Sequence, residues 1–272
     1  MVRVVRARPA DGDAVVWDPD RGVLDVEQLA GIDAVFHLAG EPIGARRWTA
    51  RQKARILNSR TRSTEIMARA LSSLTPRPRV LVSASAMGFY GERGDEVLTE
   101  ASDPGEGFLA SVCRRWEAST NAASEADIRV VHLRTGLVLD PSGGLLKRIL
   151  LPFRLGLGGR LASGRQWMSW ITRDDHIRAM LHLLDNDVAG GPFNVCAPDP
   201  VRNDAFTSAL AVALRRPALL PVPKALIAIP YGRELATDLL SSTRMVPQRL
   251  SEMGFRCAAT GLDAALRAML RL

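Results

Sequence analysis

Short apolar runs alternate with longer helix-like stretches through the first half of the chain, and this alternation limits the fold more than any other feature. The runs occupy residues 2–5, 33–38, 79–82 and 128–133. Apolar residues follow one another in these runs, as expected of strands that are covered on both faces. Strands separated by helices indicate βαβ units and a parallel sheet. The sequence therefore predicts a doubly wound α/β fold with a Rossmann-like sheet.

The stretches between these runs predict two helices and one hairpin. Helices are expected over residues 49–71 and 107–125, and Thr49 is a favourable residue to cap the first. The segments 14–17 and 23–24 flank an Asp-Pro-Asp-Arg-Gly turn, which predicts a hairpin.

The character of the sequence changes after residue 140, where a smaller α+β lobe is expected. A glycine-rich loop is followed by a helix, a strand, a helix and a final one-sided apolar stripe, over residues 155–164, 174–184, 193–196, 203–214 and 262–270. We therefore predict a dinucleotide-binding domain over residues 1–150 and a substrate lobe over residues 151–272.

Composition excludes several protein classes. Hydrophobic residues make up 47% of the chain, but no apolar run approaches the length of a membrane helix, so no membrane is expected as a partner. Basic residues are interspersed with valines at the N-terminus, unlike a signal peptide. The cysteines Cys113, Cys196 and Cys257 match no CxxC spacing. These features favour a reducing, cytoplasmic location.

The net charge of +7 invites comparison with nucleic-acid-binding proteins. The arginines are spread along the chain, however, and no nucleic-acid-binding module accompanies them. A nucleic-acid partner is therefore not expected, and a small-molecule substrate is. A homodimer is left open.

The end of the first strand suggests which dinucleotide is bound. In a doubly wound sheet, ligands bind at the carboxyl ends of the strands. Arg6, Ala7 and Arg8 follow the first run, where an acidic residue would suit a ribose hydroxyl and an arginine suits a 2′-phosphate. Within this pattern the arginines favour NADP over NAD, and solvated strand-end charges are the alternative.

Two further strand ends carry candidate residues. Leu38, Ala39 and Gly40 are small or apolar and would let a nucleotide lie close to the backbone. Ser85 follows the next run and could hydrogen-bond a substrate oxygen, with Tyr90 nearby as a general acid. A plain strand-to-loop turn and a packed aromatic ring are the alternatives for these two segments.

Three motifs at these strand ends resemble the NAD-dependent epimerase/dehydratase branch of the extended short-chain dehydrogenases/reductases. They are HLAG at 37–40, Ser-x-Ser-x-x-x-x-Tyr-Gly at 83–91 and RTGLVL at 134–139. Four longer segments resemble an atypical subfamily known as epimerase family proteins, at residues 39–49, 57–64, 150–171 and 246–255. The last lies in a tail, residues 216–270, that resembles the C-terminal module of the subfamily.

The resemblance implies a Rossmann domain that binds NADP(H). It places Arg6 with Ala7 and Arg8 at the adenosine phosphate, Leu38 and Ala39 along the dinucleotide, Arg60 as a further contact and Val138 beside the nicotinamide. It also places Ser85 at the catalytic Ser/Thr position of the family.

The sequence departs from the family pattern in two places. No GxxGxxG turn precedes residues 2–5, so the chain is expected to start at the second strand of the fold and to be incomplete. The Tyr-x-x-x-Lys pair is also missing, because Leu109 and Cys113 occupy the corresponding positions.

Two functions remain open on these observations. The first is an atypical NADP(H)-dependent oxidoreductase or epimerase that acts on a small polar or sugar-like substrate. The second is a non-catalytic protein that binds NADPH or docks a partner. Asp174, Asp175 and His176 are read as a charged helix start rather than a metal site, and Arg160 and Trp167 are left open as pocket or surface residues.

Overall fold

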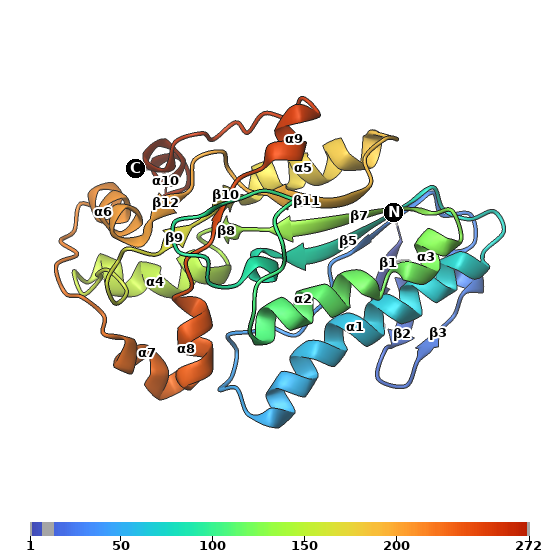
Figure 1. Ribbon diagram of the computed structural model, residues 1–272, viewed down its shortest axis with the longest axis horizontal. Helices are drawn as coiled ribbons and strands as arrows, with labels where there is room; N and C mark the ends of the chain where they lie inside the picture. The colour runs from blue at the N-terminus through green and yellow to red at the C-terminus, as the bar shows by residue number, and fades with distance from the viewer. Residues whose placement is uncertain (1, 7–13, 271–272) are drawn as a thin grey trace.

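A parallel four-stranded sheet forms the centre of the computed structural model, which describes residues 2–6 and 14–270 (Figure 1). The strand order is β11 (Gly191–Val195), β7 (Arg129–Thr135), β5 (Val80–Ala86) and β4 (Ala34–His37). The β5 strand pairs along its whole length with β7, from Val80 opposite Arg129 to Ala86 opposite Thr135. The predicted α/β class with a parallel sheet is confirmed.

Helices cover both faces of this sheet. Figure 1 shows α1 (Ala50–Ser73), α2 (Phe108–Ala118) and α3 (Asn121–Glu125) on one face and α5 (Arg173–Asp185) on the other. The Thr49 side chain caps α1 by accepting a hydrogen bond from the Gln52 amide at 3.2 Å, as predicted.

The single helix predicted over residues 107–125 is two helices. The Ser119 hydroxyl donates back to the Arg115 carbonyl, and the Thr120 hydroxyl donates to the Glu117 carbonyl, each at 2.7 Å. Side-chain hydroxyls that bond nearby carbonyls compete with the helix ladder. The break between α2 and α3 falls at these two residues.

Neighbouring residues of β5 pack on opposite faces of the sheet. Leu81 packs in a cluster with Met67 and Leu71 of α1. Val80 and Val82 belong to a cluster on the other face that includes helix α5. Strands buried on both faces read as continuous apolar runs, which explains the sequence pattern.

A second sheet of three strands lies beside the β4 edge. It consists of β1 (Arg3–Val5), β2 (Ala14–Asp18) and β3 (Val23–Leu24), with β2 and β3 antiparallel as the predicted hairpin requires. Trp17 makes an edge contact with His37, with ring centroids 5.8 Å apart. Among the described residues, β1 is hydrogen-bonded to β2 alone and β4 to β5 alone.

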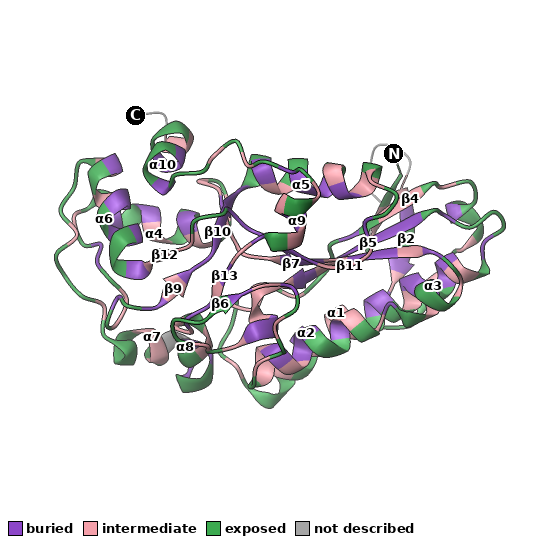
Figure 2. Cartoon of the chain, turned by 45° about the horizontal axis from the view of Figure 1, so that its top comes forward, coloured by how far each residue is buried: buried purple, intermediate pink, exposed green. Residues whose placement is uncertain are grey.

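A second group of elements surrounds its own core. Its strands are β8 (Leu137–Leu139) with β10 (Trp170–Thr172), and β9 (Trp167–Met168) with β12 (Val201–Arg202). Its helices are α4 (Gly144–Arg154), α6 (Asn203–Leu214) and α10 (Leu262–Leu270). Figure 2 shows their buried faces turned toward one another. Leu262, Ala265 and Leu266 are buried there, as the apolar stripe predicted.

The remaining elements are short. They are η1 (Glu27–Leu29), η2 (Met87–Tyr90), β6 (Val97–Leu98), α7 (Lys224–Tyr231), α8 (Arg233–Leu239), β13 (Arg244–Met245) and α9 (Gln248–Glu252). β6 and β13 form a parallel pair. No helix in the described parts of the chain has the length and apolar character needed to cross a membrane.

The chain passes between the two cores more than once. α5 packs on the central sheet and β11 is its edge strand, although both come after residue 150. A boundary at residue 150 therefore divides the sequence, but elements from both sides of it build the central sheet and its covering helices.

Candidate functional site

The carboxyl ends of β4, β5 and β7 lie at one edge of the central sheet because the three strands are parallel and adjacent. His37 pairs with Ser83 in the sheet, and Ser85 pairs with Arg134. Leu38, Ala39 and Gly40 follow β4 and are exposed. The predicted residues of these strand ends therefore share the edge at which ligands bind in this class of fold.

Arg60 lies directly against the turn that follows β4. A Cβ atom on Gly40 would come within 3.1 Å of the Arg60 Cζ atom. The guanidinium donates to the backbone carbonyls of Glu41 at 2.9 Å and Ile56 at 3.1 Å, and it lies 5.0 Å from the Trp116 ring. The structure thus brings together two predicted cofactor contacts, Gly40 and Arg60.

The charge of Arg60 is not balanced by an ion pair within residues 2–6 and 14–270. The Glu41 carboxylate acts on Arg60 only through its nearby charge, because it pairs with Arg55 at 3.5 Å and accepts from Gln52 at 3.2 Å. Burial lowers the pKa of Arg60, yet an arginine keeps its proton in proteins. A half-buried cation beside an exposed turn is suited to an anionic ligand.

The other predicted cofactor contacts lie in different surroundings. Arg6 is exposed and lies 3.7 Å from Asp20 in a surface ion pair. Ala7 and Arg8 lie outside the described residues. Val138 pairs with Ile171 between β8 and β10 and is partly buried.

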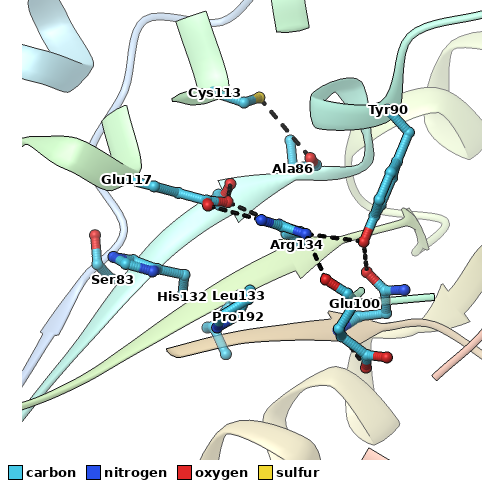
Figure 3. Close-up of polar contacts among 12 residues, drawn as sticks. Ser83, Ala86, Tyr90, Glu100, Cys113, Glu117, His132, Leu133, Arg134 and Pro192 are labelled. Carbon is cyan, nitrogen blue, oxygen red and sulfur yellow. Dashed lines mark hydrogen bonds and ion pairs between the residues drawn. The ribbon is translucent and has the colours of Figure 1, made fainter. Parts of the chain in front are cut away.

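Ser85 belongs to a buried polar network that the sequence did not reveal. Figure 3 shows Glu117, Arg134 and Tyr90 of this network. The strand β5 extends through Ser85 to Ala86, so this serine is in the sheet rather than in the loop after it. Its hydroxyl donates to the Glu117 carboxylate at 2.7 Å. Glu117 also forms a bidentate ion pair with Arg134, with two N–O distances of 2.9 Å.

Tyr90 forms the other end of this network. Its hydroxyl donates to the Asn194 side-chain oxygen at 2.6 Å and accepts from Arg134 at 3.1 Å. The side chain is fully buried, and this burial raises the pKa of Tyr90 to about 12. The hydroxyl keeps its proton at neutral pH, and the structure places it inside the protein.

The helix α2 presents the positions of the missing Tyr-x-x-x-Lys pair to the loop after β5. A Cβ atom on Gly88 would lie 3.2 Å from Leu109 Cβ and 3.8 Å from the Cys113 sulfur. Burial raises the pKa of Cys113 to about 12. Leu109 and Cys113 therefore face the loop after β5, where the Tyr-x-x-x-Lys pair would lie. The aliphatic side chain of Leu109 and the neutral thiol of Cys113 cannot replace a tyrosine and a lysine.

The C-terminal elements contact this region through α8. The Lys53 Nζ atom of α1 pairs with Glu234 at 2.8 Å. Burial and the nearby Glu234 charge raise the pKa of Asp238 to about 6. One oxygen of Asp238 is buried and finds no hydrogen-bond partner among residues 2–6 and 14–270.

Asp174, Asp175 and His176 lie in the first turn of α5, which begins at Arg173, so they form a charged helix start as predicted. Asp175 is buried and accepts hydrogen bonds from the Ala258 and Ala259 amides, each at 2.9 Å. In the part of the chain that the structure describes, no group of three or more His, Cys, Asp or Glu side chains could hold a metal ion.

Trp167, which sequence analysis left open, is partly buried between charged groups. Its ring lies 4.8 Å from the Arg202 guanidinium and 4.4 Å from that of Arg244, and its Nε1 atom donates to Asp95 at 2.7 Å. Arg160 is exposed.

His37, at the end of β4, gives a pH prediction. It is buried beside Ser63, and burial lowers the pKa of His37 from 6.5 to about 4. Between these two pH values the unfolded chain protonates His37 and the folded chain does not. Acidification through this window therefore removes about 3 kcal/mol of stability.

Urea unfolding of the wild type and of His37→Gln from pH 7 to pH 4 would measure this effect. The wild type should lose stability more steeply than the variant as the pH falls. Parallel curves for the two proteins would contradict the assignment, because other titrating groups are common to both.

Comparison with known proteins shows two matched regions. Residues 19–196 match the model of the NAD dependent epimerase/dehydratase family, and residues 222–269 match a domain of unknown function. An epimerase family protein of Mycobacterium tuberculosis is 38% identical over 266 residues, covering 98% of this chain and 88% of the relative.

Solved structures show the same likeness. The crystal structure of the human epimerase family protein SDR39U1 with NADPH has a TM-score of 0.89 and 31% identity, covering 98% of this chain and 90% of the human chain. The UDP-N-acetylglucosamine 4-epimerase of Bacillus cereus has a TM-score of 0.75 at 16% identity, covering 98% of this chain and 88% of that one, and shares the fold.

Proposed function

Because the chain belongs to the NAD dependent epimerase/dehydratase family, we propose that it binds NADP(H) and acts as an oxidoreductase or epimerase on a small polar or sugar-like substrate. The observation that carries this proposal is the unbalanced Arg60 guanidinium against the exposed turn at Gly40. The similar human protein, whose crystal structure contains NADPH, supports the choice of cofactor.

The residues of the β4 edge fit the cofactor. Leu38 and Ala39 offer an exposed backbone along which a dinucleotide can lie, and Arg60 offers a charge for a phosphate. We retain Arg6, Ala7 and Arg8 as proposed contacts to the adenosine phosphate and Val138 as a neighbour of the nicotinamide. The bound nicotinamide would supply or accept a hydride.

The substrate would lie beside Ser85. Its hydroxyl donates to Glu117, which Arg134 holds in turn, so the Ser85 oxygen can accept a hydrogen bond from a substrate hydroxyl. The sequence proposes Tyr90 as the proton donor. The hydrogen bonds of its hydroxyl to Asn194 and Arg134 support a positioning role instead. We also propose that residues 1–150 supply most cofactor contacts and residues 151–272, including the module at 216–270, supply substrate contacts.

Arg60→Met tests the cofactor site. Loss of a charged hydrogen bond to phosphate should weaken NADPH binding by about 10- to 100-fold. NADPH fluorescence titration would measure it, with Arg62→Met as a control, because Arg62 is exposed on the same helix. Equal affinity in the wild type and Arg60→Met would remove Arg60 from the site. No binding by the wild type at millimolar NADPH would contradict the cofactor proposal.

A non-catalytic NADPH-binding or partner-docking protein is the second candidate. Leu109 and Cys113 at the expected catalytic positions favour it. Assays of NADPH oxidation with aldehydes, ketones and nucleotide sugars would separate the two functions. Tight binding without turnover of any substrate would support the second candidate over the first.

A further inference from the structure

Two long stretches of the chain contain no acidic residue. Residues 141–172 and 205–233 lack both Asp and Glu, although acidic residues are common elsewhere in the sequence. Their basic residues are Lys147, Arg148, Arg154, Arg160, Arg165, Arg215, Arg216, Lys224 and Arg233. Both stretches therefore carry net positive charge with no compensation inside them.

The fold brings the two stretches side by side. The Val222 amide donates to the Arg160 carbonyl at 2.8 Å, and the Ala162 amide donates to the Val222 carbonyl at 2.9 Å. A Cβ atom on Gly159 would lie 1.6 Å from the Leu220 carbonyl oxygen, so this close backbone contact requires glycine. Arg216 also donates to the Arg154 carbonyl at 3.0 Å, so the end of α4, the loop after it and the segment before α7 lie in one region.

Large aliphatic side chains are exposed in the same segments. Their exposed fractions run from 57% to 84%, for Leu151, Leu155, Leu157, Leu219, Leu220, Leu226 and Ile229. Single exposed leucines are normal, but several in neighbouring segments indicate a binding surface. We call these side chains, with the basic residues of the two stretches, the basic–aliphatic face.

The positive charge and the exposed aliphatic side chains of this face together indicate which kind of partner it binds. A second copy of this chain would present the same positive charge and be repelled. A nucleic acid would satisfy the charge but leave the leucines in water. An anionic lipid surface satisfies both, since it attracts basic residues and accepts aliphatic side chains at the headgroup boundary.

We propose that the basic–aliphatic face binds the surface of anionic lipid bilayers, with the protein lying on the membrane rather than crossing it. This face contains none of the proposed cofactor contacts, and Arg148 donates to the Gly44 carbonyl in the loop after them. The proposal departs from the sequence-based expectation that no membrane is a partner. Peripheral binding needs no spanning helix.

Sedimentation with vesicles tests the proposal. We expect the full chain to sediment with phosphatidylcholine vesicles that contain 30% phosphatidylglycerol, roughly the charge of an anionic membrane surface, and to remain in solution with phosphatidylcholine alone. High salt should release the protein because it screens the attraction.

Two double variants separate charge from apolar contact. Lys147→Gln with Arg215→Gln should weaken binding on the order of twentyfold, since each basic residue near the surface contributes about a fivefold change. Leu155→Ser with Leu219→Ser should weaken it on the order of tenfold. The control, Arg62→Gln with Arg69→Gln, removes the same charge from exposed positions of α1, and we expect less than a twofold change.

Three outcomes would overturn the proposal. The first is no difference between anionic and neutral vesicles, and the second is an equal loss in the α1 control. The third is binding to duplex DNA that matches the vesicle affinity and ignores the leucine changes, which would indicate a nucleic acid partner. All changed side chains are exposed, so urea midpoints equal to the wild type would show that each variant is folded.

Discussion

Arg134→Met is expected to lower the free energy of unfolding by about 3–5 kcal/mol, because it leaves the Glu117 carboxylate buried without its partner. Both side chains of this pair are almost inaccessible, with 6% of Arg134 and 12% of Glu117 exposed. The same change removes a hydrogen bond to Tyr90 and the contact of the guanidinium with the Phe89 ring at 3.4 Å. Urea unfolding followed by tryptophan fluorescence would measure the loss.

Two further variants make this result specific. Arg134→Met with Glu117→Gln removes both charges and should recover more than half of the lost stability. Arg69→Met breaks a surface pair with Glu65, whose side chains are 72% and 50% exposed, and should cost less than about 1 kcal/mol. Similar losses for Arg134→Met and Arg69→Met would show that the Arg134 pair is solvated in solution.

Asp175→Asn is expected to lower the free energy of unfolding by about 3 kcal/mol. The carboxylate accepts from the Ala258 and Ala259 amides and pairs with Arg178, and an amide group cannot accept on both sides. The variant should also expose the segment after α9 to proteases, since these bonds anchor it to α5. Urea unfolding and limited proteolysis with mass spectrometry would measure the two effects.

The pKa of Asp175 gives an independent check. Burial alone would raise this pKa, but the bonds from Ala258 and Ala259 and the charge of Arg178 outweigh burial and lower it. The folded chain therefore releases this proton more readily than the unfolded chain, and the stabilisation is lost as the pH falls below the usual range of an aspartate.

Asp174→Asn is the matched control for Asp175→Asn. Asp174 lies in the same first turn of α5 but its side chain is 81% exposed, so we expect a loss below about 1 kcal/mol from the helix dipole. An equal loss in both variants would assign the effect to the helix terminus rather than to the anchored segment.

The placement of the candidate site was only partly predictable from sequence. Gly40 and Ser85 lie on one edge because parallel strands bring their ends together, as the pattern of runs implied. Arg60 reaches that edge from helix α1. Glu117 was missed, although an arginine at the end of a buried strand requires a buried acceptor. A helix at this position was expected, although as one helix over residues 107–125 rather than two, and its rotation relative to β7 was not predicted.

Local patterns determined the α/β class, the hairpin of β2 and β3, the cap at Thr49 and the family, because each depends on residues close together in the chain. Tertiary structure alone decided that Tyr90 bonds Asn194, 104 residues away, and that Ser85 meets Glu117, 32 residues away. The physical reason is that periodicity encodes which face of an element is buried. The partner of a buried polar group is chosen only when distant elements pack.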